Sequence, residues 1–255
     1  MEKDKEYIKR KLKTNMIMFG KVIMPNMFSA GSPDFHYKIA DTLMNDQNNQ
    51  VNIIAPRGHA KSSIVGGVYP LYHIMNHSGA KLIVLVSRTQ DHAIKLLGTI
   101  KDTLEYSESF RQIYGYWGQH SARQWAKSEV ELKDNSMIIC KGTGQQLRGI
   151  KVGSQRPTCI IVDDPEDENN TKTAEAMEQN LRWLLQSAVP SLDPQKGKII
   201  VIGTPQHQRC MVEILKEMKG WKNMHFAPNL ETNTALWEEW QPIKKLVQKK
   251  EELDS

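Results

Sequence analysis

Five short apolar segments without regular polar alternation constrain the fold of this chain more than any other feature. They are Val51–Pro56, Lys81–Ser87, Met137–Lys141, Thr158–Asp164 and Lys198–Gly203. Continuous apolar runs that end at turn residues are typical of strands buried on both faces, as in a parallel sheet. A weaker sixth strand is predicted at Asn223–Pro228.

Segments with helical periodicity lie between these predicted strands. The first has one apolar face, formed by Ile64, Val68, Leu71, Tyr72 and Met75. We expect Pro70 to kink this helix and the adjacent glycine pair to weaken it. Further helices are predicted at residues 89–106, 173–188 and 209–219. Strands alternating with helices predict βαβ units and an α/β fold with a doubly wound, mostly parallel sheet.

Composition excludes several other classes of protein. The 255 residues are 39% hydrophobic and 25% charged, which excludes collagen-like, low-complexity and wholly disordered chains. No apolar stretch approaches about 18 residues, so we expect no membrane-spanning helix. Cys140, Cys159 and Cys210 form no CxxC pair, which argues against zinc and a disulfide framework and fits a reducing compartment.

Three regions are expected along the chain. Residues 1–30 are predicted as a basic helical lead-in, residues 31–232 as one α/β domain, and residues 233–255 as a charged helical linker. Within the domain, residues 107–136 are predicted to be irregular.

Charge is unevenly distributed along the chain. Residues 163–178 hold seven acids and one lysine, a local charge of −6 in a chain of net charge +5, so the remainder carries +11. A basic body around one acidic cluster is compatible with polyanion binding outside and a metal site inside. Ordinary solvated surface charge is the alternative interpretation.

The first predicted strand leads through the segment APRGHAKSS, residues 55–63, directly into a helix. This strand–loop–helix order is the context of a phosphate-binding loop, in which backbone N–H groups and the helix dipole bind phosphate. The candidate phosphate-contacting residues are Arg57, Gly58, His59, Ala60, Lys61, Ser62 and Ser63. Lys61 would reach the β- and γ-phosphates, and the Ser62 hydroxyl would bind Mg²⁺. Ala55 and Ala60 replace both outer glycines of the usual pattern, so a basic turn that starts a helix is the alternative.

The segment Cys159–Asp164 is an apolar strand that ends in two carboxylates. In phosphate-loop folds the first acid of such a strand holds Mg²⁺ and the next polarises the attacking water, so Asp163 is the candidate metal ligand. Either Asp164 or Glu166 is the candidate catalytic base. A turn or a helix cap is the alternative for adjacent acids at a strand end.

Two further residues have candidate catalytic roles. Arg57 would contact the γ-phosphate from within its own loop, or else pair with an acid. Thr204, in the Gly-Thr-Pro turn that follows the fifth strand, lies where doubly wound sheets bind ligands, so it could sense the γ-phosphate. Turns use these residue types routinely, so the Gly-Thr-Pro signal alone is weak.

Taken in order, these motifs resemble the ATPase domain of the large terminase subunits of tailed bacteriophages over residues 35–240. Matching segments besides the three motifs are YPLY at 69–72, SRTQDHA at 87–93, GQQLRGI at 144–150 and ALWEEW at 235–240. The resemblance implies a RecA-like P-loop NTPase of the additional-strand type, with ATP and Mg²⁺ as nucleotide and cofactor.

The resemblance also implies particular residues for catalysis. Arg148, in the segment LRG, matches an arginine that members of the family offer to the ATP of a neighbouring subunit. Arg57 and Arg156 are the alternatives for this role. An adenine-contacting element normally precedes the phosphate loop, and Phe35-His36-Tyr37 is the candidate for it; His36 could equally be a packed or an exposed residue.

The implied function is that of a motor that pumps double-stranded DNA into a procapsid in the host cytoplasm. Its implied partners are DNA, contacted mostly through the backbone, the portal protein, the small terminase subunit and further copies in a pentameric ring. Only 27 residues follow the sixth predicted strand, too few for the nuclease domain of the family, so we expect no nuclease activity. The alternatives are a helicase-like remodelling ATPase and a nucleotide-dependent assembly module without turnover.

Overall fold

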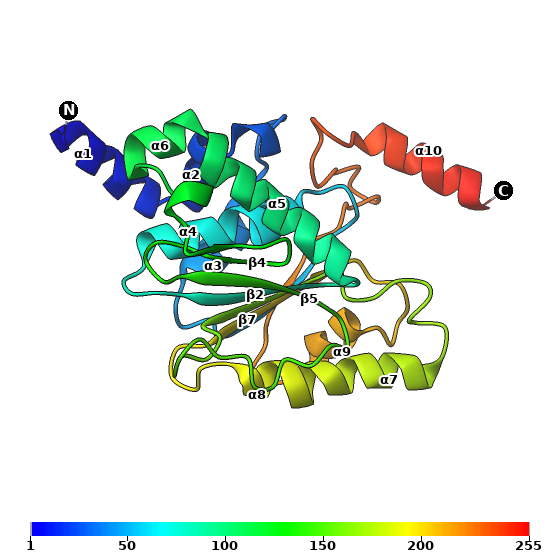
Figure 1. Ribbon diagram of the computed structural model, residues 1–255. Coiled ribbons are helices and arrows are strands. Elements are labelled where there is room, and N and C mark those ends of the chain that lie inside the picture. The colour runs from blue at the N-terminus through cyan, green and yellow to red at the C-terminus, as the bar shows by residue number, and fades with distance from the viewer. Residues whose placement is uncertain (1, 255) are drawn as a thin grey trace.

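The computed structural model describes residues 2–254, with the side chains of residues 3–248 and 252. Within this part of the chain one eight-stranded sheet has the strand order β3-β4-β5-β2-β6-β7-β1-β8 (Figure 1). Its parallel strands are β1 (Gln50–Ile54), β2 (Leu82–Ser87), β5 (Met137–Gly142), β6 (Cys159–Asp163), β7 (Lys198–Gly203) and β8 (Lys222–His225). The α/β fold with a mostly parallel, doubly wound sheet is confirmed.

The position of β7 determines the geometry of the sheet edge. This strand lies between β1 and β6, with Gly203 paired to Ile54 on one side and Ile202 paired to Asp163 on the other. The carboxyl ends of three parallel strands are therefore adjacent, although they are far apart in sequence. This is the additional strand that the resemblance implied.

Helices cover both faces of the sheet (Figure 1). On one side of the sheet lie α2 (Met16–Ile23), α3 (Asp34–Met44), α4 (Tyr69–Asn76) and α5 (Gln90–Tyr106), and on the other lie α7 (Ala174–Trp183), α8 (Val189–Ser191) and α9 (Met211–Glu217). Along β2, Ile83 and Leu85 belong to the first core, whereas Val84 and Val86 belong to the second. Successive side chains of a strand point to opposite faces of the sheet, so the continuous apolar run of β2 contributes to both cores.

The prediction that residues 107–136 are irregular is wrong. They form α6 (Glu108–Tyr114), a 3₁₀ turn (Gln119–Ser121) and a hairpin of β3 (Gln124–Trp125) and β4 (Glu129–Glu131). The hairpin strand β4 pairs antiparallel with β5 and extends the sheet. These strands are too short to produce a detectable apolar period, and their pairing with β5 is a tertiary contact.

The helix after the phosphate loop contains a π-helical segment, Ser63–Val68, before α4. Pro70 lies in the first turn of α4 and has no N–H to donate to the preceding turn. Gly66 and Gly67 have a packing role, because a Cβ atom would lie 2.9 Å from Leu96 and 2.6 Å from Met27 respectively. A second π-helical segment, Leu184–Ala188, links α7 to α8.

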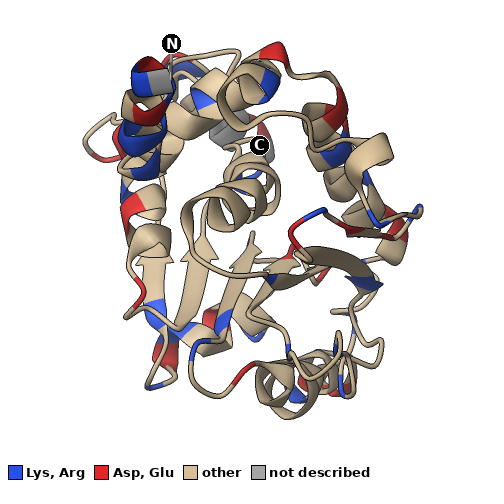
Figure 2. Cartoon of the chain, turned by 60° about the vertical axis from the view of Figure 1, so that its left-hand side comes forward, with Lys and Arg blue, Asp and Glu red and all other residues tan. Residues whose placement is uncertain are grey.

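The two ends of the chain are helical. At the N-terminus, α1 (Glu2–Lys13) carries part of the basic charge (Figure 2), while Leu12, Met16 and Phe19 lie in the same core as the sheet. At the C-terminus, α10 (Ile243–Asp254) follows a non-helical segment. Among the helices described, none is long and apolar enough to cross a membrane.

Candidate active site

The phosphate loop has an unusual backbone conformation. Gly58 and Ala60 have φ angles of 76° and 56°, in the left-handed region. Directly afterwards the chain becomes helical, with the N–H of Ile64 donating to the carbonyl of Ala60 at 3.0 Å. Ala60 stands at a position where the usual pattern has glycine, and its Cβ makes this conformation cost roughly 1–2 kcal/mol. The backbone at residue 60 is therefore left-handed although alanine stands there in place of glycine.

Lys61 lies between the ends of two strands. Its Nζ donates to the carbonyl of Pro56 and to Oγ1 of Thr204, both at 3.0 Å, and only 4% of the residue is exposed. Thr204 in turn donates to the carbonyl of Ala55 at 3.1 Å. Burial lowers the pKa of Lys61, and the nearby Asp164 and Asp163 oppose this shift. The two strand-end motifs thus form one connected group.

Ser62 and Asp163 are directly joined: Oγ of Ser62 donates to Oδ1 of Asp163 at 2.7 Å. Asp163 is 6% exposed, and burial together with the charge of Asp164 raises the pKa of its carboxyl to about 7. A buried carboxylate beside a hydroxyl supplies the oxygen ligands that Mg²⁺ prefers, and its charge is stabilised by a cation. These two residues therefore fit a Mg²⁺ ion that takes its other ligands from water and phosphate.

The described residues contain no cluster of three or more His, Cys, Asp or Glu side chains that could hold a metal ion. Mg²⁺ in phosphate-transfer sites is commonly bound through one or two carboxylates and the phosphates of the substrate.

Asp164 faces the space around the phosphate loop. Its φ of 42° turns the chain sharply after β6, and its Oδ1 accepts a hydrogen bond from the backbone N–H of Thr204 at 3.2 Å. It lines both of the cavities described below. A strained residue at a strand end with its carboxylate in a cavity is suited to polarise a water molecule.

Glu166 has a different environment. Its Oε2 accepts a hydrogen bond from the N–H of Met211, the first residue of α9, at 2.6 Å, and its Oε1 accepts one from Asn180 at 3.2 Å. The residue is 8% exposed, and burial raises its pKa despite these two bonds. Glu166 thus links α9 to α7, and of the two candidate bases the geometry favours Asp164.

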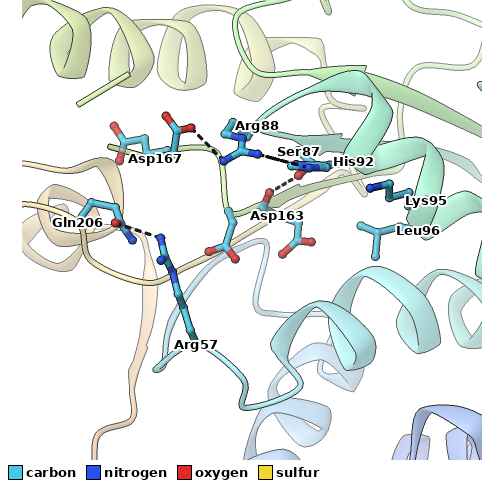
Figure 3. A pocket seen from close by; sticks show the side chains of 11 residues that line it. Arg57, Ser87, Arg88, His92, Lys95, Leu96, Asp163, Asp167 and Gln206 are labelled. Carbon is cyan, nitrogen blue, oxygen red and sulfur yellow. Dashed lines mark hydrogen bonds and ion pairs between the residues drawn. The ribbon is translucent and has the colours of Figure 1, made fainter. Parts of the chain in front are cut away.

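Two cavities flank these residues. The first, of about 410 Å³ (Figure 3), is lined by Arg57, Ser87, Arg88, His92, Lys95, Leu96, Asp163, Asp164, Glu166, Asp167 and Gln206. The second, of about 630 Å³, is lined by Asn26, Met27, Ser29, Arg57, Gly58, His59, Ala60, Lys61, Ser62, Ser63, Thr99, Asp164, Trp237 and Trp240. Arg57 and Asp164 belong to both, so they stand at the boundary between the cavities.

Arg57 is exposed and points to the first cavity, where its Nη2 donates to Oε1 of Gln206 at 3.2 Å (Figure 3). It thus pairs with an amide and not with an acid. Across the same cavity Arg88 makes an ion pair with Asp167 at 3.0 Å. The motif reasoning did not assign Arg88, although its position directly after β2 places it at the same sheet edge.

Arg148 is not among the described residues that line either cavity. It is exposed, and its guanidinium donates to the carbonyl of Gln186, with Nε at 3.0 Å. Within one subunit, Arg148 therefore lies outside the site formed by Lys61 and Asp163.

The candidate adenine-contacting segment packs beneath the phosphate loop. His36 is 1% exposed, and its Nε2 lies 3.1 Å from the carbonyl oxygen of His59. Phe35 is 3% exposed and contacts His36 edge to face. Both side chains thus support the loop from behind, and neither is among the described residues that line the second cavity.

The fold has relatives among solved structures. The crystal structure of the HK97 bacteriophage large terminase superposes with a TM-score of 0.54 at 11% identity, covering 85% of this chain and 44% of that one. The chain has the fold of part of a large terminase. The large terminase from the thermophilic bacteriophage D6E also matches, with a TM-score of 0.41, 11% identity and coverage of 81% and 43%. The chain spans less than half of the length of either structure.

The resemblance drawn from the motifs is thus confirmed for the fold. No protein-family model and no curated protein matches the sequence. At 11% identity the structural match establishes the architecture, while the chemistry has to be argued from the residues described above.

Proposed function

We propose that this chain hydrolyses ATP with Mg²⁺ and uses the reaction to move double-stranded DNA, as the ATPase part of a terminase-like motor. The observation that carries the proposal is the convergence of three strand-end motifs. Lys61 contacts Thr204, and Ser62 contacts Asp163, at the carboxyl edge of adjacent strands. A charged amine, a hydroxyl and a carboxylate at this place are the parts that phosphoryl transfer requires.

In this proposal the chain's own residues bind and orient the reactants. The loop N–H groups and Lys61 hold the phosphates, and Asp164 orients a water molecule toward the γ-phosphorus. The new P–O bond forms as the bond to the β,γ-bridging oxygen breaks, and Asp164 accepts the proton of the water. Mg²⁺, when bound by Ser62 and Asp163, would neutralise charge on the phosphates.

The proposal of DNA as the moved substrate rests on charge and on the fold. Outside the acidic segment the chain carries a charge of +11, which suits the sequence-independent contacts to backbone phosphates that a packaging motor needs. One neighbour of known structure is a bacteriophage large terminase. We therefore propose a portal protein, a small terminase subunit and further copies in a ring as partners.

The chemical part of the proposal is tested by ATP hydrolysis. We expect Mg²⁺-dependent turnover in the wild type and its loss in Lys61→Ala and Asp163→Asn, with folding monitored by circular dichroism. Hydrolysis that persists in folded Lys61→Ala protein would refute the site assignment.

The motor part needs a separate assay. DNA protected inside procapsids in an ATP-dependent manner supports packaging. Strand displacement without packaging instead supports the helicase-like alternative.

A further inference from the structure

The second cavity is lined in part by residues outside the phosphate loop. Trp237 and Trp240, from the segment between β8 and α10, line it together with the loop. Their rings are stacked, with centroids 5.7 Å apart and an interplanar angle of 29°. Trp237 is 8% exposed, whereas Trp240 is 49% exposed. The half-exposed ring of Trp240 thus lines a cavity that the phosphate loop also lines.

The tryptophan pair is held in a defined place relative to that loop. Trp237 contacts the ring of His36 edge to face, with centroids 4.8 Å apart, and His36 in turn contacts the carbonyl of His59. Beside Trp240, Oε2 of Glu239 accepts a hydrogen bond from the N–H of Gly31 at 3.0 Å. The segment is therefore anchored both to the phosphate loop and to the chain before α3.

The cavity also offers polar groups and space beyond the phosphates. Asn26 and Ser29 line it together with the apolar Met27. Nε1 of Trp237 is buried and has no hydrogen-bond partner among the described residues. At about 630 Å³ the cavity lies within the range of sites that enclose small ligands.

The geometry points to Trp240 as the stacking platform for the nucleotide base, with the triphosphate on the loop of residues 57–63. This inference rests on the proposed function and assigns the base to a segment that lies about 180 residues after the phosphate loop. An aromatic ring recognises the face that all bases share, so the site favours a nucleoside triphosphate over inorganic triphosphate without strong selection among bases.

The test separates binding of the base from binding of the phosphates. The affinities of ATP and of inorganic tripolyphosphate, each with Mg²⁺, are measured by calorimetry for the wild type, Trp240→Ala and Trp240→Phe. Tyr106→Ala is the matched control, because Tyr106 is 76% exposed and lines other cavities. Thermal unfolding shows whether each variant is folded.

We expect Trp240→Ala to weaken ATP about tenfold, as loss of about 1.4 kcal/mol of stacking would, with the affinity for tripolyphosphate unchanged. Trp240→Phe should restore most of the ATP affinity, and Tyr106→Ala should not alter it. Equal ATP affinity in wild type and Trp240→Ala, or equal weakening of both ligands, overturns the inference. A wild type that binds neither ligand overturns the proposed function itself.

Discussion

The phosphate loop and the loop around Arg148 are both basic segments that contain glycine, but their structures differ. In the first, Lys61 is buried and makes two hydrogen bonds to neighbouring strand ends. In the second, Arg148 is exposed and contacts a single backbone carbonyl. A Cβ atom on Gly144 or Gly149 would meet no described atom within 4 Å.

The difference indicates what one subunit can preorganise. Contacts made before substrate arrives fix the groups of the phosphate loop, which reduces the reorganisation needed for catalysis. The guanidinium of Arg148 is exposed and binds the carbonyl of Gln186, so it would have to exchange that carbonyl for a phosphate to serve a neighbouring subunit. The predictions below test this division, from the largest expected effect to the smallest.

The largest effect is expected when Arg148 and Lys61 are each replaced and the two variants are then mixed in one ring. Arg148→Ala and Lys61→Ala should each abolish the ATPase activity of an assembled ring. A mixture should regain activity at interfaces that combine an intact Arg148 with an intact Lys61. Arginines supplied in trans accelerate hydrolysis by roughly 10³- to 10⁵-fold in other NTPases.

The measurement is steady-state ATP hydrolysis at several mixing ratios under conditions in which the wild type assembles. Arg156→Ala tests the alternative arginine: Arg156 is also exposed and contacts a backbone carbonyl, that of Pro190, and this variant should keep its activity if Arg148 is the arginine supplied in trans. A mixture that stays inactive while the wild type assembles and hydrolyses ATP shows that Arg148 does not act across the interface.

Within the preorganised region, Asp164 and Glu166 should respond differently to removal of their charge. Asp164→Asn should lower kcat by roughly 10²-fold or more, because the group that polarises water is lost, while stability changes little. Glu166→Gln should lower the free energy of unfolding by about 1–3 kcal/mol, because a single amide oxygen can accept from only one of Met211 and Asn180 and leaves the other donor unpaired. Chemical denaturation and single-turnover kinetics on both variants provide the comparison; the reverse pattern would make Glu166 the base.

Support of the phosphate loop by His36 should make stability sensitive to acid. Burial lowers the pKa of His36 to about 4, against about 6.5 in an unfolded chain. The unfolded state therefore binds more protons as the pH falls below 6.5, so stability is full above 6.5 and is lost toward pH 4. Between pH 6.5 and 5 the loss from this residue is roughly 2 kcal/mol.

Urea denaturation at both pH values measures this loss. His36→Gln retains a side-chain donor for the carbonyl of His59 and should show a smaller difference between the two pH values. An unchanged pH dependence in this variant would mean that other groups cause the acid sensitivity.

The smallest effect concerns backbone strain in the two loops. Ala60→Gly removes the strain of a left-handed alanine but adds chain entropy to the unfolded state, so the net gain should be within about 1 kcal/mol. Gly149→Ala places a Cβ at a φ of 88° in the exposed loop and should lower stability by about 1 kcal/mol. Each change corresponds to a shift of a few degrees in Tm, which calorimetry measures. A large loss of stability in Ala60→Gly would contradict the strain assigned to Ala60.

The local sequence pattern was sufficient to predict the buried strands and the order of the motifs. Each buried strand is a continuous apolar run, and the groups that bind phosphate follow directly after β1 in the chain, so neighbouring residues carry the information. The contact of Ser62 with Asp163 was also foreseeable, since carboxyl ends of parallel strands meet at one edge of a sheet. The short hairpin β3–β4 was missed, because its two- and three-residue strands have no period of their own.

Other features depended on which distant segments pack together. Asp164 and Glu166 are both acids just after β6, and the contacts of Glu166 with Met211 and Asn180 distinguish their environments. His36 was a candidate contact for adenine because of its place in the chain. It is instead buried under the phosphate loop, and the second cavity is lined by Trp237 and Trp240. The sequence by itself determined the strands and the residue types at their ends, because strand period and loop composition are local. The tertiary structure alone decided which side chains share a cavity, because these contacts join residues far apart in the chain.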